Sequence, residues 1–179
     1  MARVTRIDWK ECATAAEAVE LESTLLLEYR PPFNRAGVWK GEPWWLVIEV
    51  ETSNLTLRLQ RETSPGSLGP LPPSSRHTLG TVVRALLRTT SPKWTLSEFP
   101  RGLISSSFPL VCRLQVPSPA TFIQALTAAL AGDLVALLAE LEALPQPATI
   151  TEQTYWQEER DNLTKVHLLA METVLDAPR

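Results

Sequence analysis

The chain has 179 residues, of which 44% are hydrophobic and 21% charged, so it can bury a core and is not expected to be disordered throughout. Its formal net charge of −3 argues against binding nucleic acid through the charge of the whole molecule, although a local basic patch stays compatible with it. Two cysteines and two histidines do not support a disulfide framework or a zinc site, which favours a reducing cytoplasm. No apolar run reaches the length of about 18 residues that a membrane helix needs.

The first predicted elements are a short strand and a helix. Apolar and polar residues alternate over Val4–Trp9, which favours a strand. Thr14 and Glu17 fit a capping box, in which each side chain accepts a hydrogen bond from the other's backbone amide. The helix is expected to run from Ala15 to Tyr29 and to stop before a pair of prolines. Its apolar stripe consists of Ala18, Leu21, Leu25 and Leu26.

The middle of the chain predicts an antiparallel hairpin and a second helix. The strands are Trp44–Val50 and Leu55–Gln60, both rich in β-branched, aromatic and leucine residues. Residues 64–75 are rich in proline, glycine and serine and are expected to form a loop. Ser74 or Ser75 then caps a helix with the apolar stripe Leu79, Val82, Val83, Leu86 and Leu87.

The remainder is expected to be irregular at first and then helical. Leu110–Val116 is predicted as a short strand after an irregular stretch. Helical spacing begins at Pro119, breaks near Gly132 and stops at Pro145. A last helix runs from about Thr151 to Leu175. Its inward residues are expected to be Tyr155, Leu163, Val166, Leu169 and Val174.

The predicted fold class is α+β, with a small antiparallel sheet and flanking helices followed by an all-helical C-terminal segment. The expected division is residues 1–90 as the sheet-containing domain, 91–118 as an irregular linker and 119–179 as the helical segment.

Glu22 stands out because it lies on the expected apolar face of the first helix. An unpaired buried carboxylate is costly, so it needs a partner. One interpretation is an ion pair with an arginine, for example Arg6 or Arg35. The other is a bound metal ion, because carboxylate oxygens are ligands for hard divalent cations.

Three marks in order resemble one nuclease family. The first is Glu17-Ala18-Val19-Glu20-Leu21-Glu22, followed by Tyr29-Arg30-Pro31-Pro32-Phe33-Asn34. The second is the hairpin, and the third is Leu68-Gly69-Pro70-Leu71-Pro72 ahead of a helix. Together, from Val4 to about Leu87, they resemble the GIY-YIG nuclease domain of UvrC-type excinucleases. Because the strands that bear the GIY and YIG tripeptides are missing, the likeness is to a partial domain.

The resemblance implies DNA as substrate, phosphodiester hydrolysis in nucleotide excision repair, and Mg²⁺ or Mn²⁺ as cofactor. It implies that Glu22 is the metal ligand and that Asn34 supports the active site; by itself, Asn34 is equally well a turn former after two prolines. The family's catalytic Tyr and Arg have no counterpart in residues 1–179. The isolated chain is therefore expected to be inactive unless another chain or a segment upstream of Met1 supplies them.

Two other interpretations stay open. One is a non-catalytic module that binds DNA or a protein partner in repair, with an exposed leucine stripe on Phe122–Leu141 as the protein interface. The missing strands would also leave an exposed sheet edge for a homodimer. The other is an unrelated α/β domain.

Trp39, Trp44 and Trp45 could stack bases, but core and hairpin packing is favoured for them.

Overall fold

The computed structural model describes residues 9–29, 41–104 and 107–175, and these form two compact units. The units divide the chain between Gly41 and Glu42. The described part of the first unit contains the helix α1 (Ala15–Tyr29), with the predicted bounds. The predicted strand Val4–Trp9 lies outside the described residues except for Trp9.

The second unit is built on a four-stranded antiparallel sheet. Its strands are β1 (Trp44–Glu51), β2 (Asn54–Gln60), β3 (Leu68–Leu71) and β4 (Val111–Gln115), in the spatial order β3-β1-β2-β4. The hairpin of β1 and β2 and the strand β4 are predicted correctly to within a residue. The mixed α+β class, with helices toward the C-terminal end, is confirmed.

The strand β3 differs from the prediction, which has a loop over residues 64–75. Leu71 pairs with Trp44 and Leu68 pairs with Leu46, so only four residues join the sheet. Gly69 has a φ of +146°, and a β-carbon there would come within 3.0 Å of the Trp44 carbonyl oxygen and the Trp45 ring. The Gly-Pro sequence that reads as a loop therefore forms an edge strand in which glycine is required.

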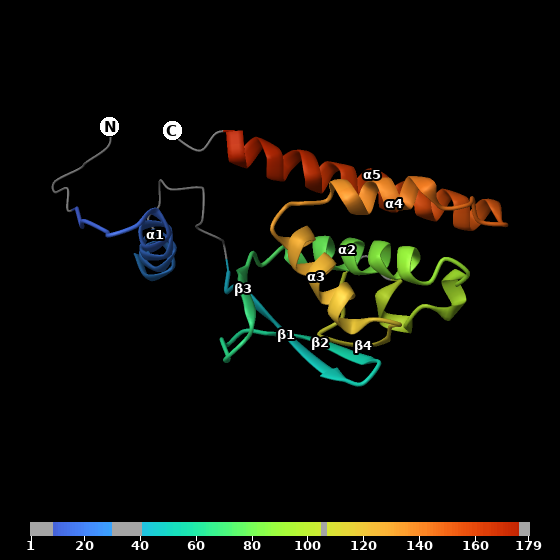
Figure 1. Ribbon diagram of the computed structural model, residues 1–179, viewed down its shortest axis with the longest axis horizontal. Coiled ribbons are helices and arrows are strands. Elements are labelled where there is room, and N and C mark those ends of the chain that lie inside the picture. The colour runs from blue at the N-terminus through green and yellow to red at the C-terminus, as the bar shows by residue number, and fades with distance from the viewer. Residues whose placement is uncertain (1–8, 30–40, 105–106, 176–179) are drawn as a thin grey trace. The chain divides into compact units, whose positions relative to one another are not determined.

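The helices of this unit lie on one side of the sheet. These are α2 (Ser75–Thr90), α3 (Pro119–Leu130), α4 (Val135–Ala143) and α5 (Ile150–Leu175). In Figure 1, α2 and α3 lie over one face of the sheet, and α4 and α5 lie on the far side of α2. The predicted break at Gly132 is confirmed, because that residue has a φ of +93° and α3 and α4 are bent by 119°. The capping prediction for α2 is only partly right, because Ser74 is the N-cap but its hydroxyl makes no capping hydrogen bond.

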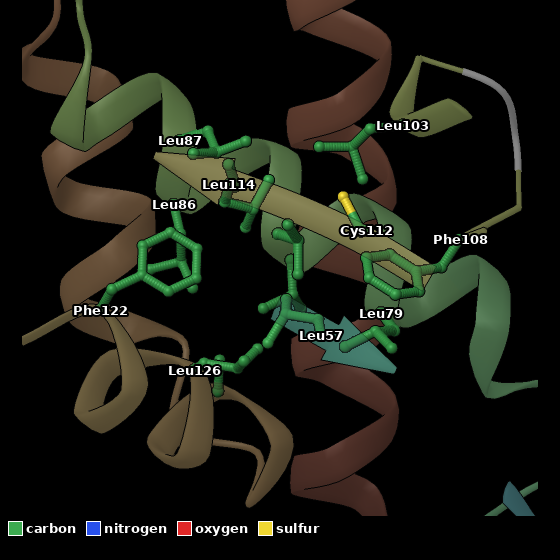
Figure 2. Close-up of a cluster of buried hydrophobic side chains, with 14 of the residues drawn as sticks. Leu57, Leu79, Leu86, Leu87, Leu103, Phe108, Cys112, Leu114, Phe122 and Leu126 are labelled. Carbon is green, nitrogen blue, oxygen red and sulfur yellow. The ribbon is translucent and has the colours of Figure 1, made fainter. Parts of the chain in front are cut away.

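Alternating residues of the strands fill a single core. Leu55, Leu57 and Leu59 of β2 point inward, while Asn54 and Arg58 on the same strand are exposed. Figure 2 shows Leu57, Cys112 and Leu114 from the sheet packed against side chains of α2 and α3. Those helical side chains include Leu79, Leu86, Leu87, Phe122 and Leu126.

The core does not stop at the expected domain boundaries near residues 90 and 118. Leu134, Leu137 and Leu163 of the C-terminal helices belong to the same buried cluster as the strands. The expected linker 91–118 carries two short 3₁₀ turns (Leu96–Glu98 and Arg101–Leu103) and the strand β4. Its Phe99 is buried and packs between the rings of Trp94 and Trp156. Residues 42–179 therefore form one structural unit.

The protein-binding interpretation expects an exposed leucine stripe on Phe122–Leu141, and this expectation is wrong. Phe122, Leu126, Leu134 and Leu137 are all buried. The stripe faces inward because α3 and α4 pack on α2 and the sheet, so the helical periodicity reports the core and not an interface.

Among the described residues, no single helix is long and apolar enough to cross a membrane. One bent pair, Pro119–Leu130 with Val135–Ala143, meets the criterion by length and composition alone.

Candidate functional site

The predicted metal ligand Glu22 lies on α1, and its side chain is exposed. The expectation that it lies on a buried helix face is therefore wrong. Ala18 and Leu25 on the expected apolar stripe are also exposed, because α1 is the one helix in the described part of its unit. Amphipathic spacing predicts which side of a helix is apolar, but it does not show that another layer covers that side.

No hydrogen bond or ion pair is formed by the Glu22 carboxylate within the described residues. The arginines considered as its partners, Arg6 and Arg35, lie outside those residues, so the ion-pair interpretation stays untested. Mg²⁺ is commonly bound by one or two carboxylates with the rest of its shell made of water, so a single exposed carboxylate fits a weakly held hydrated ion.

The N-terminus of α1 is capped much as the sequence predicts. The Glu17 amide donates to the Thr14 hydroxyl at 3.1 Å. The Glu17 carboxylate accepts from the Ala13 amide at 2.9 Å, one residue earlier than in a standard capping box. Glu17 is therefore a cap, and Glu20 is exposed. Glu22 is the remaining acid of the motif.

The other predicted site residue, Asn34, lies outside the described residues, as do Arg30, Trp39 and Lys40. The structure therefore does not show whether Asn34 and Glu22 come together. The part of the chain that is described contains no group of three or more histidine, cysteine, aspartate or glutamate side chains that could hold a metal ion. Any metal site would rest on Glu22 together with water or with residues beyond the described ranges.

The tryptophans at the start of β1 pack against the protein. Trp44 is buried, and its indole donates a hydrogen bond to the Pro73 carbonyl at 3.2 Å. The guanidinium carbon of Arg61 lies 3.3 Å from the centre of the Trp44 ring. Because the ring face is covered, Trp44 has no surface left for a nucleic acid base. The packing interpretation is confirmed for Trp44, and Trp45 is half-buried beside Gly69.

The uncovered face of the sheet carries charges of both signs. This face has a polar hollow of about 490 Å³. Its lining includes Glu49 and Glu51 of β1, Arg58 of β2 and Arg113 of β4. Arg58 and Glu49 lie 3.6 Å apart across the strands. Because the two carboxylates offset the two guanidiniums, this face is not the basic patch that a phosphate backbone favours.

Both edges of the sheet carry a residue that disfavours strand addition. Pro70 in the edge strand β3 has no amide proton to donate, and β4 at the other edge is five residues long with the exposed Arg113 at its centre. Prolines, charged side chains and short strands are common ways in which proteins protect sheet edges. A homodimer through an edge stays a prediction, and these features count against it.

Cys112 is buried in β4, as expected for a small hydrophobic side chain. Burial raises the pKa of its thiol from 9.0 to about 12. A raised thiol pKa means that the folded state favours the neutral form. The neutral thiol therefore contributes to the free energy of unfolding in full below about pH 9, and this contribution is lost as the pH rises toward 12.

We expect Cys112 to resist thiol reagents in the folded protein. The thiolate is the reactive form, and the raised pKa of Cys112 keeps its thiol protonated at pH 8. In a Cys12→Ala variant, the reagent DTNB should give no fast reaction until denaturant is added. The Cys112→Ala variant is the matched control, because the half-buried Cys12 should still react. Rapid modification of Cys112 without denaturant would contradict its buried position.

Two buried arginines on α2 are missing from the sequence-based predictions. Arg84 is 1% exposed and Arg88 7% exposed. The guanidinium of Arg84 pairs with the Glu159 carboxylate of α5 through two contacts of 2.8 and 2.9 Å. Arg84 also donates to the Leu103 carbonyl at 2.9 Å, which ties the 91–104 segment to both helices. The interruption of the α2 apolar pattern at positions 84 and 88 is the one signal that the sequence carries for them.

Comparison with protein-family models, curated proteins and solved structures gives no significant match to this chain.

Proposed function

We propose that the chain is a divergent protein of the UvrC-type GIY-YIG group that takes part in DNA repair and uses Glu22 to bind a divalent metal ion. The observation that carries the proposal is the exposed carboxylate of Glu22 on α1, just ahead of the hairpin of β1 and β2 in the chain. The strand β3, formed by the Gly-Pro mark, and the helix α2 then follow in the order that the resemblance implies.

When bound, a divalent metal ion would supply electrostatic stabilisation of the oxygen that leaves during phosphodiester hydrolysis. The contribution of this chain is one carboxylate that can hold and orient a hydrated Mg²⁺ or Mn²⁺. A nucleophile-activating tyrosine and a charge-stabilising arginine are also required, and residues 1–179 contain neither at the family positions. The proposal therefore assigns metal binding to this chain and assigns cleavage to an assembly that includes those groups.

The competing role is a non-catalytic module that binds a protein partner. The net charge of −3 supports a protein in preference to DNA as its partner. With the expected leucine stripe buried, such a module would have to use another surface. Leu110, just before β4, and Val111, its first residue, are about half exposed and offer a small apolar contact.

We expect Glu22→Gln to weaken Mn²⁺ binding at least tenfold. The substitution keeps the size of the side chain and removes the charge that a hard cation requires. Binding is measured through the paramagnetic broadening that Mn²⁺ produces in the NMR signals of α1, with Mg²⁺ as competitor.

Glu20→Gln is the matched control, because Glu20 is exposed on the same helix two residues earlier. It should bind Mn²⁺ as the parent chain does. If the two variants broaden equally, or if the parent shows no site-selective broadening, the assignment of Glu22 as a metal ligand is wrong.

A further inference from the structure

Two buried arginines, Arg84 and Arg88, lie one helical turn apart on α2, and one of them pairs with a carboxylate of α5. That carboxylate, Glu159, is paired with Arg84, as described above. Arg88 donates to backbone carbonyls instead, at 2.7 Å to Pro92 and 3.2 Å to Pro145. Its guanidinium carbon also lies 5.6 Å from the centre of the Trp156 ring. Among the described residues, the ion pairs formed do not include Arg88.

A buried guanidinium without a carboxylate is unusual, since buried charges are normally paired. The carbonyls, the ring of Trp156 and the C-terminal dipole of α2 each offset part of the charge. All of these are dipoles or quadrupoles, and none of them carries a negative charge. One positive charge therefore stays uncompensated inside the protein, and the low dielectric of the interior strengthens its attraction for an anion.

Arg88 lines a cavity between α2, the end of α4 and α5. The cavity has a volume of about 40 Å³ and is partly open to solvent. That volume is well below the about 150 Å³ of a cavity that encloses benzene, so it has room for an acidic head group, and the rest of a ligand would extend along the walls toward the opening. Its apolar walls are the side chains of Ala85, Leu141, Leu144, Pro145, Pro147 and Trp156.

The charges around the cavity indicate the charge of its ligand. Arg84 and Glu159 neutralise each other inside. Arg160 and the exposed Glu142, which carry opposite charges, also line the cavity. When Arg84, the partner of Glu159, is counted with the lining residues, three arginines face two glutamates, so one negative charge balances the site and a dianion would exceed it.

We propose that this cavity binds a monocarboxylate whose stem is apolar or aromatic. The carboxylate pairs with the Arg88 guanidinium, which has the planar donor geometry that suits it. The stem lies along Trp156 and the leucine and proline walls. The proposal uses residues of the second unit alone and is independent of the metal site proposed at Glu22.

The test is a titration of the ¹⁵N-labelled full chain with sodium benzoate, in which benzoate replaces chloride at constant ionic strength. The signals followed are the side-chain N–H groups of Arg88 and Trp156. We expect saturable shifts with a dissociation constant of about 1 mM or lower, as is reasonable for a ligand of this size. Benzamide has the same shape without the charge and should not saturate the site, and inorganic phosphate should bind more weakly than benzoate.

Variants separate binding from a purely structural role of Arg88. Arg88→Gln should abolish the benzoate response, whereas Arg113→Gln, which removes an exposed arginine of the sheet, should leave it unchanged. Arg88→Gln also removes the hydrogen bonds from Arg88 to the Pro92 and Pro145 carbonyls. Glu142→Gln therefore supplies a test that does not disturb the core. Loss of the exposed Glu142 charge should tighten benzoate binding by roughly two- to fivefold. The proposal is overturned if benzamide and benzoate act alike, if a folded Arg88→Gln variant binds benzoate normally, or if Glu142→Gln leaves the affinity unchanged.

Discussion

Replacing Glu159 by alanine is expected to lower the free energy of unfolding by about 3–5 kcal/mol. The carboxylate is 11% exposed at its side chain and is the charged partner of Arg84, which is 1% exposed. Its removal leaves a buried guanidinium whose remaining acceptors include the neutral Leu103 carbonyl and Thr81 hydroxyl. A loss of this size would be a large part of the roughly 5–15 kcal/mol typical of a whole domain. Urea denaturation followed by far-UV circular dichroism measures it.

The neighbouring exposed residue offers a matched control, and a double variant tests the cause. Glu158→Ala should change stability by less than about 0.5 kcal/mol, because Glu158 is exposed. The double variant Arg84→Met/Glu159→Leu should recover most of the loss, since an apolar pair can replace a buried ion pair. A double variant less stable than Glu159→Ala would show that the cost does not come from an unpaired charge.

Replacing Phe122 by alanine is expected to cost about 3–5 kcal/mol, through lost burial and the cavity that remains. Phe122 is 1% exposed and joins α3 to the core formed by the sheet and α2, as Figure 2 shows. Because residues 42–179 share that core, the loss should appear in the whole unit. Far-UV circular dichroism and tryptophan fluorescence should report one transition, shifted equally by both probes.

Val135→Ala on α4 is the control, because Val135 is 62% exposed and its truncation should change stability by less than about 0.5 kcal/mol. A Phe122→Ala protein in which the helices unfold well before the sheet would point instead to a separate C-terminal segment. That result would restore the division near residues 91–118 that the sequence alone predicts.

Local patterns predicted most of the secondary structure. The bounds of α1 follow from a capping box at one end and two prolines at the other. The hairpin follows from two apolar runs of strand length, and the break between α3 and α4 follows from Gly132. The strand β3 escaped detection because its four residues include Gly69 and Pro70, and its place in the sheet depends on pairing with β1, distant in sequence.

The candidate sites likewise differ in whether neighbouring residues or contacts between distant segments indicate them. Glu22 was found because it interrupts an apolar stripe and belongs to a motif, and both are properties of neighbouring residues. The pairing of Arg84 with Glu159 joins residues 75 positions apart, and no local pattern indicates it. The cavity at Arg88 likewise needs α2, α4 and α5 to be brought together.

By itself, the sequence determined the α+β class, the order of most helices and strands, and the faces of α2 and α3 that are apolar. These properties depend on periodicity, capping and chain breakers, which act over a few residues. The tertiary structure decided that the leucines of α3 and α4 are core, that the residues between α2 and β4 are packed, and that one of two buried arginines has no carboxylate. Each of these depends on which surfaces meet, because burial and charge pairing are set by contacts between segments distant in the chain.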